Sequence, residues 1–267
     1  LNVIVNQINW RVDNLIIGTL TNSKTLGIFN IGSQLVFSFI AFASAISNIF
    51  TPKIVQMVKQ NVSHAVLMAQ LCSIGRFQMI VLGYIFVIFT VFGELFIDLF
   101  VGAEFSEAFL VALIPMVPFI FVLAQTSTNA VLQALNKHKV RSLLLLGTAF
   151  ANVVVSIILV KKLGMIGAVW GTAIALFVGE LLLVNIYLYR VVGLNMLHFY
   201  QQLLRYSMPV MLISMPLAFV FFNYLPATWF GLILGCFFTG LIYLVLSYFL
   251  SLMPLERQDV KRLIFSR

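Results

Sequence analysis

Residues 77–92 read FQMIVLGYIFVIFTVF, a run without one charged side chain, and the apolar character continues to Phe100. A bilayer has a hydrocarbon core roughly 30 Å thick, and a helix that crosses it needs about 20 mostly apolar residues. This stretch therefore predicts a membrane-spanning helix. The strands of a membrane barrel are excluded, because their segments of about 10 alternating residues do not give such unbroken runs.

The same pattern recurs along the whole chain. Of its 267 residues, 62% are hydrophobic and only 9% are charged, against roughly 25% charged residues in soluble domains. The predicted spans are Leu1–Leu20, Gly27–Phe50, Phe77–Phe100, Ala108–Leu132, Ser142–Val160, Ile166–Tyr189, Met208–Tyr224 and Phe230–Leu252. The sequence predicts an all-α membrane protein, a polytopic bundle of about eight transmembrane helices.

Two segments beside the third span have mixed character. Residues 51–73 combine apolar and polar side chains, so they either lie along the inner membrane interface or extend the third span into the cytoplasm. At the other end of that span, Gly93 and Gly102 bracket a segment that we predict to be a short interfacial turn rather than continued helix.

The basic residues predict the orientation of the bundle. Twelve of the 16 Lys and Arg residues fall on one side of the predicted spans, three on the other, and Arg11 within the first span. Because cytoplasmic loops carry the excess of Lys and Arg, the twelve-charge side is predicted to be cytoplasmic. Both ends of the chain then lie in the cytoplasm, and the expected location is the inner (plasma) membrane of a bacterium.

Several function classes are disfavoured. The net charge of +8 follows the loops, so we expect no nucleic-acid partner. The chain has no G-x-S-x-G, phosphate-cradling Gly-Lys-Ser or H-E-x-x-H motif, so we expect no enzyme activity. His64, His138 and His198 are scattered over three loops, so we predict no metal site and no cofactor apart from a coupling proton or sodium ion.

The first predicted span carries charge in its middle, within NQINWRVDNLIIG (residues 6–18). Charged residues at membrane depth are costly, so they usually face a wet cavity or a buried partner. Arg11 and Asn14 share one helix face, where the Arg11 guanidinium is suited to grip a phosphate. Asp13, on another face, is a candidate site for a coupling cation. For both charged residues, a structural role satisfied by neighbouring helices stays open.

Polar residues recur on other spans. Gln34 lies four residues from Asn30 and from Ser38, and Gln125 lies four from Asn129, so each set shares a helix face. Amides suit hydroxyl-rich sugars, because they donate and accept without the desolvation penalty of a charge, although bonding between helices is the alternative. Glu180, near mid-depth of the sixth span, is either a proton-carrying carboxylate or a neutral structural acid.

Small residues recur every four positions on the sixth span, at Gly167, Gly171, Ala175 and Gly179. This spacing predicts a flat strip where a neighbouring helix approaches closely.

Four segments, in this order, carry a resemblance: RVDNLIIGTLTNSKTLGIFNIGSQL (11–35), FGELFIDLFVGAEF (92–105), LQALNKHKVRSL (132–143) and KKLGMIGAVWGTAIA (161–175). From about Asn6 to Tyr206 the chain resembles bacterial polysaccharide (O-antigen) flippases of the Wzx type, in the MOP superfamily. That family has about fourteen helices in two six-helix lobes with extra helices at the end. The resemblance implies a MOP/MATE-like C-terminal lobe at residues 1–190, two additional helices at 191–252 and a cytoplasmic tail at 253–267.

The resemblance also implies a function. A V-shaped cationic cavity between two lobes would take an undecaprenyl-pyrophosphate-linked oligosaccharide and pass it to the outer leaflet by alternating access. Arg11 would then contact the pyrophosphate, and Arg76 would guard the cytoplasmic mouth. The partners implied are the lipid-linked oligosaccharide, membrane lipids and a missing N-terminal lobe. The chain begins at Leu1 directly in an apolar span, so we expect its natural start to lie upstream.

Three alternatives stay open. A cation-coupled multidrug-type exporter of the same superfamily would favour carboxylates and aromatics over Arg11 in the cavity. A membrane glycan polymerase or ligase would normally need a large outer loop, and the longest one predicted here has roughly a dozen residues. The third alternative is a truncated, inactive remnant.

Overall fold

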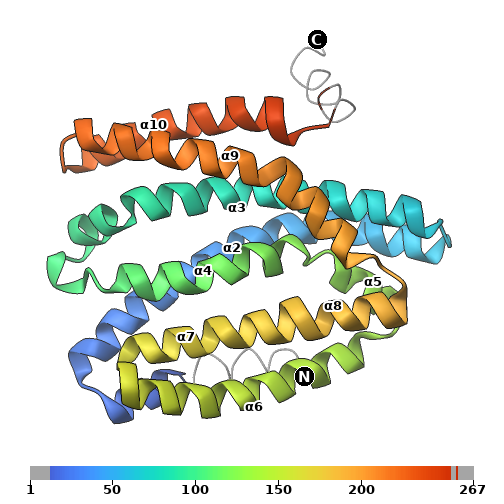
Figure 1. The fold of residues 1–267 in the computed structure, drawn as a ribbon, viewed down its shortest axis with the longest axis horizontal. Coiled ribbons are helices and arrows are strands. Elements are labelled where there is room, and N and C mark those ends of the chain that lie inside the picture. Colours follow the sequence, from blue (N-terminus) through green and yellow to red (C-terminus); the bar gives the residue numbers. More distant parts are fainter. Residues whose placement is uncertain (1–12, 254–256, 258–267) are drawn as a thin grey trace.

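The computed structural model describes residues 13–253 and Arg257, and within that part the chain is helical without strands (Figure 1). The α-helices are α2 (Ser23–Lys59), α3 (His64–Phe100), α4 (Ala108–Ala124), α5 (Thr128–Ala134), α6 (His138–Leu163), α7 (Met165–Leu176), α8 (Val184–Tyr187), α9 (Met196–Tyr224) and α10 (Trp229–Leu246). A short 3₁₀ turn, η1, covers Ala103–Phe105, and wider π-helical turns follow at η2 (Phe177–Leu183), η3 (Leu188–Val192) and η4 (Ser247–Ser251).

The predicted fold class is confirmed. Within the described residues, six helical stretches are long and apolar enough to cross a membrane, and α4 with α5 makes a seventh span that bends by 49°. Each of the seven matches one predicted span. The first predicted span lies largely outside the described residues, of which 13–20 are helical.

Two helices begin more than ten residues before their predicted spans. The third span was predicted from Phe77, but α3 starts at His64, where the Ser63 side chain accepts a hydrogen bond from the Val66 N–H at 3.4 Å. Residues 51–59 continue α2 and residues 64–73 continue α3, so only the second half of this segment extends the third span. The seventh span starts at Met196 instead of Met208, because hydropathy detects only the apolar part of a helix.

The turn predicted between Gly93 and Gly102 is also wrong at its first end. Helix α3 continues through Gly93 to Phe100, and the chain turns only at Gly102, whose φ is +106°. A Cβ on Gly93 would lie close to the rings of Phe89 and Phe109, so this glycine serves close packing rather than a turn.

The connections gather at two opposite ends of the bundle (Figure 1). The turns after α2, α5 and η3 lie at one end and contain the positive-φ residues Asn61, Asn136 and Gly193. The turns after α3, α6 and α9 lie at the other end. This alternation agrees with the predicted sidedness, although Arg76, Arg141 and Arg205, which we assigned to the cytoplasmic loops or their edges, lie inside α3, α6 and α9.

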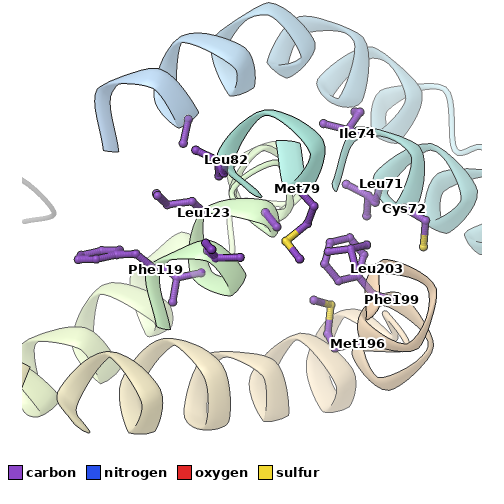
Figure 2. Close-up of a cluster of buried hydrophobic side chains, with 14 of the residues drawn as sticks. Leu71, Cys72, Ile74, Met79, Leu82, Phe119, Leu123, Met196, Phe199 and Leu203 are labelled. Atoms are coloured by element: carbon purple, nitrogen blue, oxygen red, sulfur yellow. The ribbon is translucent and has the colours of Figure 1, made fainter. Parts of the chain in front are cut away.

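One large hydrophobic core includes side chains of α9 and, at Tyr243, of α10. Figure 2 shows the part of this core between α3, α4 and α9. Phe199 and Leu203 of α9 are buried against α3, where the absence of a side chain at Gly75 makes room for the Phe199 ring. Leu82 of α3 and Leu123 of α4 belong to the same core. Residues 191–252 therefore pack on the preceding helices through a continuous apolar interior.

Helices α6 and α7 are in close backbone contact. A Cβ on Gly167 would collide with the backbone of Leu159, and one on Gly171 would collide with the Ser156 hydroxyl. Gly179 lies equally close to Thr148. The predicted packing strip is confirmed at these three glycines.

Replacing Gly167 with alanine is expected to destabilise the bundle, because the added methyl group has only backbone atoms to displace. Overpacking of this kind typically costs about 1–3 kcal/mol. The matched control is Gly147→Ala on the exposed face of α6, where a Cβ meets nothing within 4 Å and improved helix propensity should be neutral or stabilising. Thermal unfolding of both variants in detergent tests this, and an unchanged midpoint for Gly167→Ala would contradict the close contact.

Candidate functional site

A cavity of about 420 Å³ lies between α2, the α4/α5 pair, α6 and the α7–α8 span. Its apolar wall includes Phe37 and Phe119. Its polar side chains come from all four spans: Ser44, Gln125, Thr126, Thr128, Asn129, Arg141, Thr148, Asn152, Thr172 and Glu180. An apolar wall with a set of convergent polar groups is the usual form of a small-molecule site.

Two helix irregularities expose polar groups to this cavity. The bend between α4 and α5 falls at residues 125–127, where the chain reads Gln-Thr-Ser, and Gln125 is the C-cap residue of α4. Opposite, Glu180 lies in the π-helical turn η2. Irregular backbone at membrane depth is tolerated where it is buried in protein or lines a cavity, and π-turns recur at functional sites.

An ion pair closes one side of the cavity. The Arg141 Nη2 atom lies 2.6 Å from Glu180 Oε1, and both side chains are about seven-eighths buried, at 14% and 13% exposure. The Gln125 Nε2 group donates a hydrogen bond to the backbone carbonyl of Glu180 at 3.1 Å, so the amide and the ion pair meet at the same turn. Glu180 therefore forms an ion pair with Arg141, a residue that we had predicted to lie in a loop.

A second polar cluster surrounds Asp13, which is 1% exposed. Its Oδ2 accepts a hydrogen bond from the Thr172 hydroxyl at 2.7 Å, and Ser156 lies within interaction range of the same carboxylate. The Ser156 hydroxyl donates to Asn152 Oδ1 at 3.2 Å. Asp13 Oδ1 has no hydrogen-bond partner in the part of the chain that the structure describes. Because a buried carboxylate oxygen is costly to leave unmatched, this cluster is suited to a proton or a small cation.

The exposed face of α2 forms a third polar feature. Six exposed residues at steps of three or four make up the polar part of this face, which we term the α2 stripe: Asn30, Gln34, Ser38, Ala41, Ala45 and Asn48. The exposed apolar side chains of Phe37, Phe42 and Ile49 flank it. Among the described residues, the side chains of Asn30, Gln34 and Asn48 have no hydrogen-bond partner. Unpaired amides in hydrocarbon cost several kcal/mol each. The α2 stripe is therefore unsuited to contact with lipid tails.

The structure brings three of the predicted site residues together. Gln125, Asn129 and Glu180 line the cavity, and Asp13 is connected to its wall through Thr172. Gln34 lies apart from them on the α2 stripe. Arg11 lies outside the described residues.

The other two predicted residues do not line the cavity. Asn14 is half-buried beside Asp13. Arg76 is only 4% exposed, between α3 and α9, with its guanidinium carbon 5.7 Å from the centre of the Tyr206 ring. Within the described residues, no group of three His, Cys, Asp or Glu side chains is arranged to hold a metal ion.

Sequence reasoning missed four contributors: Arg141, Asn152, Thr172 and Tyr200 of α9, whose hydroxyl donates a hydrogen bond to Gln125 Oε1 at 2.8 Å. Asn152 and Ser156 did carry a signal, because two polar residues four apart inside an apolar span mark one helix face. Arg141 follows Lys137 and Lys139 and is indistinguishable from a loop charge in the sequence. For Thr172 and Tyr200 there was no signal, since each acts through a partner on a distant helix.

Part of the chain matches a known protein family. Residues 1–110 match the model of the polysaccharide biosynthesis protein family. The matched segment includes the Asp13 region, the α2 stripe and the whole of α3. No solved structure matches the chain.

A known protein of polysaccharide biosynthesis also matches the chain. The chain is 25% identical over 177 residues to a capsular polysaccharide biosynthesis protein, CapF, of Staphylococcus aureus. The match covers 65% of this chain and 44% of the relative, so the chain spans less than half of that protein's length. The chain is a multi-pass membrane protein similar to proteins of polysaccharide biosynthesis.

Proposed function

We propose that this chain is the second half of a flippase that carries an undecaprenyl-pyrophosphate-linked oligosaccharide across the bacterial inner membrane by alternating access. One observation carries the proposal: the α2 stripe is a row of polar and small residues on the exposed side of a membrane-spanning helix. A charged glycan headgroup needs a wet, polar groove, while its lipid tail stays in the bilayer. The similarity to polysaccharide biosynthesis proteins supports this choice of cargo.

In this proposal the polar groups have separate tasks. The α2 stripe lines the water-filled groove, which is completed by an N-terminal lobe, and Gln34 contacts the glycan. The amides of Gln125 and Asn129 offer donors and acceptors that suit sugar hydroxyls. Arg11 binds the pyrophosphate, since a guanidinium makes paired hydrogen bonds with phosphate oxygens. The protein moves its cargo without changing it chemically.

The Asp13 cluster supplies the energy coupling in this proposal. A proton or sodium ion on the Asp13 carboxylate neutralises a charge that is otherwise unmatched at Oδ1. Thr172 on α7 and the Asn152–Ser156 pair on α6 surround that position. Loading and unloading the ion would therefore change how these two helices are held to the first span.

A second candidate function is a cation-coupled exporter of small molecules. The buried carboxylate of Asp13 favours it, because such exporters need an ion site within the membrane. The two candidates differ in cargo and share the coupling step, so the identity of the exported compound distinguishes them.

The groove is tested with a cysteine on the α2 stripe in the full-length protein. Ala41→Cys is expected to react with a membrane-impermeant maleimide, and the attached group is expected to block glycan export in cells that depend on this protein. The control is Leu212→Cys on α9, which is 66% exposed on an apolar face and should stay unlabelled in lipid. If Ala41→Cys stays unlabelled, the α2 stripe is a protein contact and the groove is wrong. If labelling leaves glycan export intact, the proposed cargo is wrong.

A further inference from the structure

Tyr200, near the start of α9, is hydrogen-bonded to the bend between α4 and α5. Its hydroxyl donates to Gln125 Oε1 at 2.8 Å, and the Asn185 Nδ2 group donates to the same hydroxyl at 3.4 Å. Gln125 in turn donates from Nε2 to the Glu180 carbonyl. A single chain of hydrogen bonds thus connects α9, the bend, the η2 turn and α8.

The orientation of Gln125 depends on both of these bonds. Its side chain is 3% exposed, so an unmatched amide oxygen has no water to replace Tyr200. The same residue ends α4, and its backbone carbonyl accepts a hydrogen bond from the Thr128 hydroxyl at 2.8 Å in the first turn of α5. A change at the Gln125 amide therefore acts directly on the bend.

The ring of Tyr200 is held independently of its hydroxyl. It packs edge-on against Phe121 of α4 and Phe199 of α9, with ring centres 6.4 and 5.4 Å away. Removing the oxygen alone should leave the ring in place. The role of the hydroxyl is thus separable from the packing of α9.

We propose that Tyr200 is a positioning residue: through Gln125 it ties α9 to the bend between α4 and α5 and sets the polar wall of the cavity. Helix α9 then has a task beyond packing, because it holds the irregular segment on which Gln125 and Asn129 sit. The effect on transport rests on the proposed function, whereas the effect on the cavity does not.

The test uses the full-length protein with Cys72 and Cys236 replaced by alanine and a reporter, Asn129→Cys, in the cavity wall. Adding Tyr200→Phe is expected to raise the rate of reaction with a water-soluble maleimide by about 2- to 10-fold, as for the loss of one buried hydrogen bond. Gln125→Ala removes this bond and also the bond to the Glu180 carbonyl, so it should give an increase at least as large. The double variant should match Gln125→Ala alone, since the bond between Tyr200 and Gln125 is already lost there.

The matched control is Tyr224→Phe at the far end of α9, which is 84% exposed and should leave the rate unchanged. The proposal is overturned if Tyr200→Phe reacts like its parent while its melting temperature is unchanged, or if the two variants act additively. A lowered melting temperature without the change in rate would also overturn it, because Tyr200 would then serve packing alone.

Export by Tyr200→Phe without the reporter separates the two proposals. A lower turnover together with the altered labelling rate supports both. An altered labelling rate with normal glycan export leaves the positioning role standing and counts against the cavity as part of the transport path.

Discussion

Glu180→Ala is expected to lower the free energy of unfolding by about 3–5 kcal/mol, because it leaves the Arg141 charge buried without a partner. Arg141 is 14% exposed, and the described part of the chain offers it no second carboxylate. The hydrogen bond from the Gln125 amide to the backbone carbonyl at position 180 should be kept, since alanine retains that carbonyl. Unfolding in detergent, followed by heat or denaturant, measures the loss.

The control for this prediction is an ion pair at the surface. Lys24 and Glu104 are 3.5 Å apart but about 60% exposed, so Glu104→Ala should change the stability by less than about 1 kcal/mol. The double variant Arg141→Met/Glu180→Met removes both buried charges and is expected to be more stable than Glu180→Ala alone. Equal losses of stability in Glu180→Ala and Glu104→Ala would show that the buried ion pair stabilises the fold no more than the exposed one.

Asp13→Asn is expected to abolish the dependence of transport on an ion gradient. Asparagine has nearly the same shape and can still accept the hydrogen bond from Thr172, so the fold should be kept while the charge is lost. In the full-length protein reconstituted in liposomes, transport by the parent should accelerate with an imposed sodium or proton gradient. Transport by Asp13→Asn should respond to neither.

Glu94→Gln provides the control for that experiment, because Glu94 is an exposed carboxylate at the far end of α3 and should not affect coupling. A full gradient response in Asp13→Asn would remove Asp13 from the coupling step. A response lost equally in both variants would indicate a general effect of carboxylates rather than an ion site.

The fold was largely predictable because a bilayer imposes a simple rule on composition. Within residues 13–253, each apolar run long enough to cross it is helical, and the strip at Gly167 and Gly171 is a helix contact. The errors in the predicted helix bounds lie where a helix continues beyond its apolar residues. The mixed stretch of apolar and polar residues from His64 to Arg76 continues α3, and the Ser63 side chain caps the start of this segment.

The candidate site was predictable only in part, for a physical reason. Gln125 and Glu180 stood out because each is a polar residue inside an apolar run. Arg141 did not, because it lies one turn into α6 directly after loop lysines, and its role depends on a residue 39 positions away. Pairings of this kind are set by the arrangement of the helices, which cannot be seen in the order of residues in a single sequence.

Helices α2 and α3 each contain 37 residues and are joined by a tight turn around Asn61. Such a helix is about 55 Å long, some 25 Å more than the hydrocarbon core, and a tilt of about 20° shortens that by only a few Å. Within the predicted orientation this hairpin extends beyond the hydrocarbon core on the cytoplasmic side, where Ile54, Leu67 and Leu71 are buried in the main hydrophobic core. An epitope or a small folded domain inserted at residues 60–63 would therefore follow the bundle without touching the cavity, which makes this turn the natural place for a fiducial marker in electron cryomicroscopy.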